Sequence, residues 1–195
     1  MKHKRIPALA ETLRTGPLDI VPVSLPEALR LHFRIMARDD LRNPLIGPTP
    51  RPVGLRLFKR FRRPDGRKVF IHAIRLRDSG ETLGWHMIRF SGYKSANLGI
   101  AMFREDDETR GMALMARRAL IAHFFRHGDV LRFTGSVDTR NFASILLYKK
   151  LGFQESGILN HAFFDPETGR IGRRFIFDLM GEDLARLAKA EDDRN

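Results

Sequence analysis

Cysteine is absent from this chain of 195 residues. Disulfides, zinc–thiolate sites, iron–sulfur clusters and thiol nucleophiles are therefore excluded. Apolar runs extend over only a handful of residues, which is too short for a membrane-spanning helix. The basic start at residues 1–5 has no apolar segment behind it, so we expect no secretory leader. These absences fit a protein of the reducing cytoplasm, which is the location we expect.

Acidic residues are scarce in the first two-fifths of the chain. Residues 1–77 contain 18 basic and 6 acidic side chains, and so account for the entire net charge of +12. The excess peaks in residues 51–68, where eight basic side chains accompany the single acid Asp65. Such a segment attracts polyanions or an acidic partner. A solvated basic helix face that only maintains solubility explains it equally well.

The remaining sequence alternates between strand and helix patterns. An antiparallel meander followed by strand–helix–strand–helix–strand order predicts one mixed α/β domain. We expect six or seven mostly antiparallel strands with helices on both faces. The domain should span residues 17–182, after a flexible leader at 1–16 and before a C-terminal helix and tail at 183–195. The expected strands are 18–23, 69–76, 83–90, 96–103, 130–137, 153–164 and 175–179. The first expected helix begins at residue 25, after a capping box at Ser24. Further helices are expected at 54–62, 109–127 and 141–151 and from residue 181.

One glycine-bearing element leads from the third strand of the meander into the long helix at 109–127. Free backbone N–H groups and the positive end of the helix dipole meet at such a helix start, which favours anions. Small residues at Gly111 and Ala113 would let a phosphate approach the backbone. The simpler interpretation is that Gly111 only relieves crowding where the helix crosses the sheet.

A second element combines polar residues with a terminal glycine. Asn141, Ser144 and Tyr148 are spaced by three and four residues, so they share one helix face, and Gly152 and Phe153 follow. Asn141 stands where it can cap the helix. A capped amphipathic helix with a core tyrosine also explains the spacing, but a polar string facing a sheet is unusual for packing alone.

Together the two elements resemble the GNAT superfamily of acyl-CoA N-acyltransferases, in particular its RimJ/RimL-type ribosomal-protein acetyltransferase branch. The first family motif, Arg/Gln-x-x-Gly-x-Gly/Ala, maps onto residues 108–113, with Glu108 replacing the Arg or Gln. The second maps onto residues 136–157, and the separation of Gly111 from Asn141 is usual for this branch. The resemblance covers about residues 17–182 and implies the GNAT fold, in which the two central strands splay apart.

The resemblance also implies a role for each motif residue. The strand end would offer backbone groups to the pantetheine arm, the glycine-bearing turn would hold the pyrophosphate, and the polar helix face would contact the arm or order the strands. Tyr148 would be the general acid that protonates the CoA thiolate, since a phenol is protonated at neutral pH. The implied donor-binding residues are Met102, Phe103, Arg110, Gly111, Met112, Ala113, Asn141 and Ser144.

The general base remains open among His86, Glu81, Asp138 and His161, which stand near expected strand ends. A histidine on a strand is more often a hydrogen-bonded structural residue. His3, His32, His123 and His127 show no metal-ligand spacing with acidic or histidine partners on one face, so we expect no metal site.

The resemblance thus implies a bacterial enzyme that transfers an acetyl group from acetyl-CoA to an amine, most simply a protein N-terminal α-amine. A ribosomal or acidic protein would be the acceptor, the enzyme a monomer or homodimer, and no membrane would be involved. The first alternative is a GNAT acting on a small-molecule amine. The second is a degenerate GNAT that binds nucleic acid through its basic N-terminal half, which the acidic run around Glu108 favours.

Overall fold

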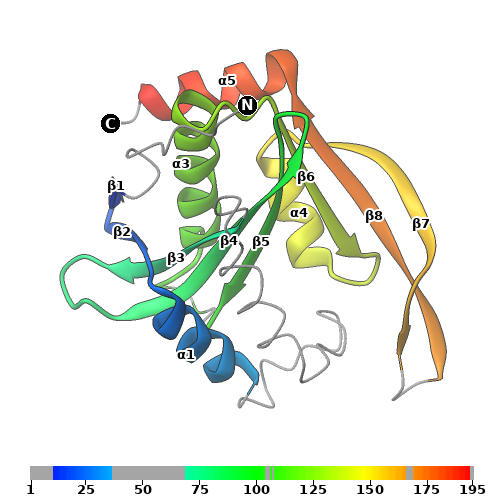
Figure 1. Ribbon diagram of the computed structural model, residues 1–195, viewed down its shortest axis with the longest axis horizontal. Coiled ribbons are helices and arrows are strands. Elements are labelled where there is room, and N and C mark those ends of the chain that lie inside the picture. Colours follow the sequence, from blue (N-terminus) through cyan, green and yellow to red (C-terminus); the bar gives the residue numbers. More distant parts are fainter. Residues whose placement is uncertain (1–10, 37–68, 104–105, 107, 166–168, 194–195) are drawn as a thin grey trace.

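The computed structural model describes residues 11–36, 69–103, 106, 108–165 and 169–193 (Figure 1). The expected loop at 39–53, the helix at 54–62 and the basic segment 51–68 lie outside these residues. Within them, no helix is long and apolar enough to cross a bilayer.

An eight-stranded sheet forms the centre of the molecule, in the order β1-β2-β3-β4-β5-β6-β8-β7. Only the β5–β6 pair is parallel, and the other neighbours are antiparallel. The predicted mixed sheet and its antiparallel meander are confirmed. The strands are β1 (Leu13–Thr15), β2 (Leu18–Pro22), β3 (Val69–Leu76), β4 (Thr82–Gly92), β5 (Ser95–Met102), β6 (Arg132–Asp138), β7 (Gln154–Asp165) and β8 (Arg170–Met180); the helices are α1 (Leu25–Met36), α3 (Met112–His127), α4 (Phe142–Lys150) and α5 (Gly181–Asp192).

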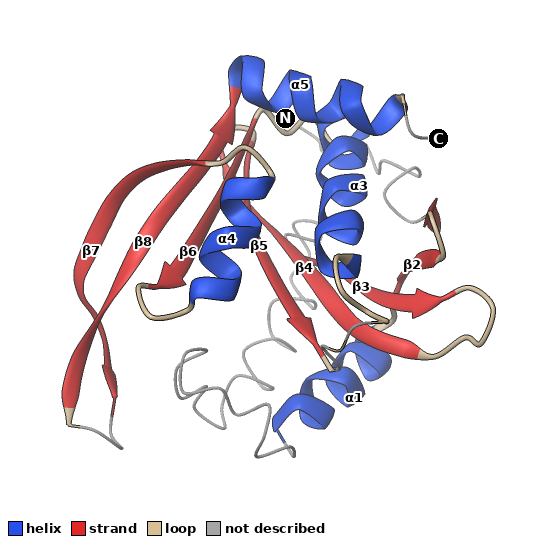
Figure 2. Cartoon of the chain, turned by 180° about the vertical axis from the view of Figure 1, so that it is seen from behind, coloured by secondary structure: helices blue, strands red, loops and turns tan. Residues whose placement is uncertain are grey.

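Helices cover both faces of the sheet, as the sequence predicts (Figures 1 and 2). On one face α1 places Ala28 and Leu31 against Ile71 and Ala73 of β3, in a small cluster that also includes Phe103. On the other face α3, α4 and α5 share a larger core with the sheet. The larger core is the layer that positions the site described below.

Residues near both ends of the described chain pack into the domain, and the predicted C-terminal helix is present as α5. Leu13–Thr15, assigned above to a flexible leader, pairs with β2 and adds an eighth strand to the sheet. The Thr15 hydroxyl donates a hydrogen bond to the Glu191 carboxylate at 3.2 Å, and both residues are buried. The C-terminal tail therefore belongs to the core as α5. Local sequence did not indicate this because the partners are 176 residues apart.

The long helix begins three residues later than predicted, at Met112 instead of residue 109. Gly111 has a φ of 83°, which ends the helical conformation on its N-terminal side. Before it, Asp106 and Thr109 close a turn: the Thr109 N–H and hydroxyl each donate to Asp106 Oδ1 at 3.0 Å. The loop is thus held by its own side chains rather than by the first helical turn.

Candidate active site

A fork opens in the middle of the sheet, between β5 and β6. These strands pair only at Ser95–Arg132, Ala96–Phe133 and Asn97–Thr134. Beyond Asn97, β5 continues along β4, whereas β6 continues along β8 to Asp138. Figure 2 shows the two strands diverging, with α4 lying over the gap. The predicted splay between the central strands is therefore present.

The β5 edge of this fork presents backbone polar groups. The Phe103 N–H donates to the Leu83 carbonyl of β4 at 2.7 Å, so the odd-numbered residues of β5 point their polar groups toward β4. The even-numbered residues Leu98, Ile100 and Met102 consequently point theirs into the fork. Of the two strand residues expected to contact the donor, Met102 thus faces the fork. Phe103 is buried, with its N–H bound to β4.

Tyr148 lies across the closed end of the fork. Its ring stacks on Phe177 of β8, with a centroid distance of 5.1 Å, and meets Phe153 edge-on at 4.9 Å. Its hydroxyl donates to the Leu98 carbonyl at 3.3 Å, just past the last paired residues of β5 and β6. A Cβ atom at Gly135 of β6 would lie 2.1 Å from this hydroxyl, so the glycine makes room for the phenol. Although the side chain is only 3% exposed, its polar atom reaches the fork.

A buried arginine stands behind this tyrosine. The Cζ atom of Arg117, on α3, lies 4.8 Å from the centroid of the Tyr148 ring, and Arg117 Nε donates to His86 Nε2 at 3.2 Å. Burial lowers the pKa of the Arg117 guanidinium from its ordinary value, while the interaction with the Tyr148 hydroxyl opposes this shift. Arg117 Nη1 has no hydrogen-bond partner among the described residues. A buried cation therefore lies beside the tyrosine ring.

Arg117 belongs to neither of the two motifs, but the sequence around it contains a signal of its importance. Ala113, Arg117, Leu120 and Phe124 follow one another at helical spacing, and the last three are buried. A charged residue within an apolar stripe is costly unless it is paired or functional.

The turn before α3 presents the glycine-bearing element to solvent. Gly111 is exposed, and a Cβ atom built there would meet nothing within 4 Å. The Met112 N–H donates a hydrogen bond to the Thr109 carbonyl at 3.1 Å. The N–H groups of Ala113 and Leu114 belong to the first turn, where a helix supplies no acceptor of its own. Arg110 and Glu108 are both exposed on this turn, whereas the Asp106 carboxylate accepts from Thr109.

The N-cap role of Asn141 is confirmed. Asn141 Oδ1 accepts a hydrogen bond from the backbone N–H of Ser144 at 3.0 Å, which fixes the start of α4 beside the end of β6. This cap fixes where α4 begins, and α4 in turn places Tyr148 at the fork. Their predicted contact with the donor remains a prediction.

The four candidate bases occupy different environments. His86 is completely buried, and burial together with Arg117 and His72 lowers its pKa well below the ordinary 6.5. Asp138 accepts two side-chain hydrogen bonds from Arg140, at 3.0 and 2.8 Å. Burial alone would raise the pKa of Asp138, but the hydrogen bonds from Arg140 outweigh it and lower the pKa. Glu81 follows the β3–β4 turn, and His161 is exposed on β7.

His86 is therefore neutral and Asp138 ionised, and each is bound to an arginine. No group of acidic residues and histidines suited to a metal occurs in the part of the chain that the structure describes.

Several solved acetyltransferase structures share this architecture. The ribosomal-protein-S5-alanine acetyltransferase of Vibrio fischeri superposes with a TM-score of 0.72 at 13% identity, over 89% of this chain and 98% of that one. RimL, a ribosomal L7/L12 alpha-N-protein acetyltransferase, gives 0.71 at 16% identity over 88% and 94%. Mycobacterium smegmatis RimJ, solved with a CoA disulfide, gives 0.69 at 19% identity over 94% of each chain. At these identities the likeness concerns the fold.

Sequence comparison identifies the family itself. No curated protein matches the chain in sequence. The family model described as "Acetyltransferase (GNAT) domain" matches residues 18–154, which is more than half of the chain and includes the fork, Gly111 and Tyr148. The chain therefore belongs to the GNAT acetyltransferases, which are acyl-CoA-dependent N-acyltransferases.

Proposed function

We propose that this enzyme transfers the acetyl group of acetyl-CoA directly to the α-amino group of a protein N-terminus, with both substrates bound together. The main support is the position of the Tyr148 hydroxyl, which is hydrogen-bonded to Leu98 at the closed end of the fork. A proton donor there faces the strand edge at which an extended thioester arm can pair.

The residues of the fork fit a CoA thioester. Ile100 and Met102 offer backbone groups along β5, as a strand edge does for an added strand. At the mouth of the fork, Gly111 leaves open space above the first turn of α3, whose N–H groups suit a pyrophosphate. Because this grip uses backbone groups, Glu108 in place of the family Arg or Gln weakens it without abolishing it.

Tyr148 completes the proton balance of the transfer. The neutral acceptor nitrogen forms a bond with the acyl carbon while the bond between that carbon and sulfur breaks. The Tyr148 hydroxyl gives its proton to the departing sulfur, and the proton lost by the amine passes through water back to the Tyr148 phenolate. The nearby Arg117 cation stabilises negative charge that develops on the phenol oxygen. Arg117 is thus a positioning residue that acts through Tyr148.

An α-amine suits this site better than a lysine. Ordinary α-amines have a pKa near 8 and lysines near 10.4, so an α-amine reaches its neutral form with far less help. His86 and Asp138, the two candidate bases nearest the fork, are both bound to arginines. The RimL and Vibrio fischeri structures are named for acetylation of ribosomal proteins, which supports a protein acceptor.

Peptide acetylation followed by mass spectrometry tests this function. A lysine-free peptide with a free N-terminus should gain one acetyl group. An N-terminally blocked peptide containing lysine, and a polyamine such as spermidine, should react far more slowly. Preferential acetylation of the polyamine would support the small-amine alternative. No thermal stabilisation by acetyl-CoA, together with retention of RNA or DNA, would support the nucleic-acid-binding alternative instead.

A further inference from the structure

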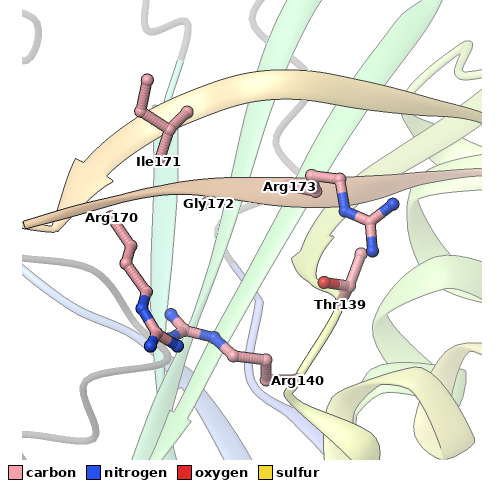
Figure 3. A pocket seen from close by; sticks show the side chains of 6 residues that line it. All are labelled: Thr139, Arg140, Arg170, Ile171, Gly172 and Arg173. Carbon is pink, nitrogen blue, oxygen red and sulfur yellow. The ribbon is translucent and has the colours of Figure 1, made fainter. Parts of the chain in front are cut away.

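An arginine-lined pocket of about 220 Å³ lies beyond the open end of β6. The β6–β8 pairing stops at Asp138–Arg174, whereas β8 extends on to Arg170 with β7 on its other side. The loop after β6 lies against this part of β8, and the Thr139 N–H donates to the Arg173 carbonyl at 3.1 Å. The lining residues, shown in Figure 3, are Thr139, Arg140, Arg170, Ile171, Gly172 and Arg173.

Among the side chains that the structure describes, the arginines of this pocket outnumber the carboxylates that contact them. Arg140 donates two hydrogen bonds to the Asp138 carboxylate, from Nε to Oδ1 and from Nη2 to Oδ2. Arg170 and Arg173 form no ion pair with any side chain that the structure describes. Figure 3 shows the Arg170 guanidinium beside that of Arg140, and the Arg173 guanidinium beside Thr139. Like charges placed together in a concave site create a strong preference for an anion.

Aromatic contacts support the same cluster. The Arg140 and Arg174 guanidinium carbons lie 5.8 and 5.1 Å from the centroid of the Phe163 ring on β7. Arg174 Nε is buried without a hydrogen-bond partner among the described residues. Arg140 and Arg174 thus pack on Phe163, and both interact with the Asp138 carboxylate. Planar guanidinium groups held in this way match the geometry of a carboxylate.

The pocket stands in a suitable place relative to the reacting centre. The Tyr148 hydroxyl lies over Gly135, and Arg140 follows five residues further along the chain. At roughly 3.3 Å per residue, the pocket lies on the order of 10–17 Å from the phenol. An extended peptide whose first nitrogen is at the fork would bring its third to fifth residues to the arginines. In the described part of the chain no strand pairs with residues 170–172 of β8 on the side that faces β6, so such a peptide can add there as a strand.

We infer that Arg140, Arg170 and Arg173 form a specificity subsite for an acidic side chain near the third to fifth residue of the acceptor peptide. This inference rests on the proposed function and adds the acceptor's chemical class to it. The positive charge of this subsite comes from Arg140, Arg170 and Arg173, which are all in the C-terminal half of the chain. The subsite therefore does not depend on the basic segment at 51–68.

The test compares two lysine-free peptides that differ only at residues three to five, with Asp and Glu in one and Asn and Gln in the other. The full-length enzyme should bind the acidic peptide roughly tenfold or more tightly, as expected for charge-assisted hydrogen bonds. This difference should appear both in calorimetry and in the KM for acetylation, and it should shrink at high salt. In the Arg170→Gln/Arg173→Gln double variant the two peptides should become equivalent.

Arg186→Gln is the matched control, because Arg186 is an exposed arginine on α5 that forms an ion pair with Asp183 in the same helix. The control should keep the preference for the acidic peptide. Equal binding of both peptides by the wild-type enzyme would overturn the inference. The inference would also be overturned if the double variant bound acetyl-CoA more weakly but bound its analogue lacking the 3′-phosphate as well as the wild type does. The pocket would then bind a phosphate of the donor. Loss of RNA binding in the variant, without a peptide preference in the wild type, would also overturn the inference.

The calorimetric arm separates the inference from the proposed function. If the acidic peptide binds preferentially but gains no acetyl group, the proposed reaction fails while the subsite stands. If both peptides are acetylated equally well and bound equally, the reaction stands while the subsite fails.

Discussion

Replacing Tyr148 by Phe removes one oxygen atom from the closed end of the fork and leaves the ring in place. The ring packs on Phe177 and Phe153, and these contacts do not involve the hydroxyl. We therefore expect a folded protein with an intact core and a specific loss of proton donation.

The structure sets the size of each effect. The hydroxyl donates to the Leu98 carbonyl at 3.3 Å, which is longer than the usual 2.7–2.8 Å of such bonds. Its loss should cost about 1 kcal/mol of unfolding free energy, or roughly 2–4 °C in Tm for a chain of this size. Loss of a general acid should lower kcat by about 10²-fold or more. The kinetic effect thus far exceeds the effect on folding.

Release of CoA thiol measures kcat, calorimetry measures acetyl-CoA affinity, and a thermal scan measures Tm. Tyr93→Phe is the control, since Tyr93 is the only other tyrosine and lies fully exposed on the β4–β5 turn. It should leave all three quantities unchanged. The reasoning fails if Tyr148→Phe keeps its turnover, or if kcat and acetyl-CoA affinity fall by the same factor.

Three further predictions follow from the geometry around the fork. Gly111→Ala places a side chain at a φ of 83° and should cost about 1 kcal/mol of stability; Gly80→Ala, at a φ of 71° in equally open space, should cost the same, but only the Gly111 variant should lose affinity for acetyl-CoA in calorimetry. Gly135→Ala should displace Tyr148, which should lower kcat and reduce the unfolding free energy measured in urea by about 1–3 kcal/mol. Gly157→Ala is the control, because its Cβ atom would meet nothing within 4 Å, and it should change neither quantity. His86 has a lowered pKa in the fold, so below pH 6.5 the unfolded chain binds more protons; the unfolding free energy should then fall as the pH drops from 7 to 5, by up to about 1.4 kcal/mol per pH unit, and His86→Gln should flatten this slope. An unchanged slope in that variant would assign the acid sensitivity to other groups.

Local sequence was sufficient wherever a short segment determines its own conformation. The meander at 69–103 was predicted nearly to the residue, because alternation and turn residues act over a few positions. The cap at Asn141 and the spacing that brings Tyr148 onto one face of α4 were equally local. With the two motifs, these features were enough to indicate the GNAT family.

Tertiary structure decided the features that join distant segments. The pairing of Leu13–Thr15 with β2 and the bond between Thr15 and Glu191 unite the two ends of the chain, and neither end encodes the other's position. The burial of Arg117 beside Tyr148 depends on how α3 and α4 cross the sheet. The arginine pocket forms only because β6 ends before β8 does. Local propensity reflects neighbouring residues, whereas strand lengths and helix crossings depend on packing of the whole core, which brings these charges together.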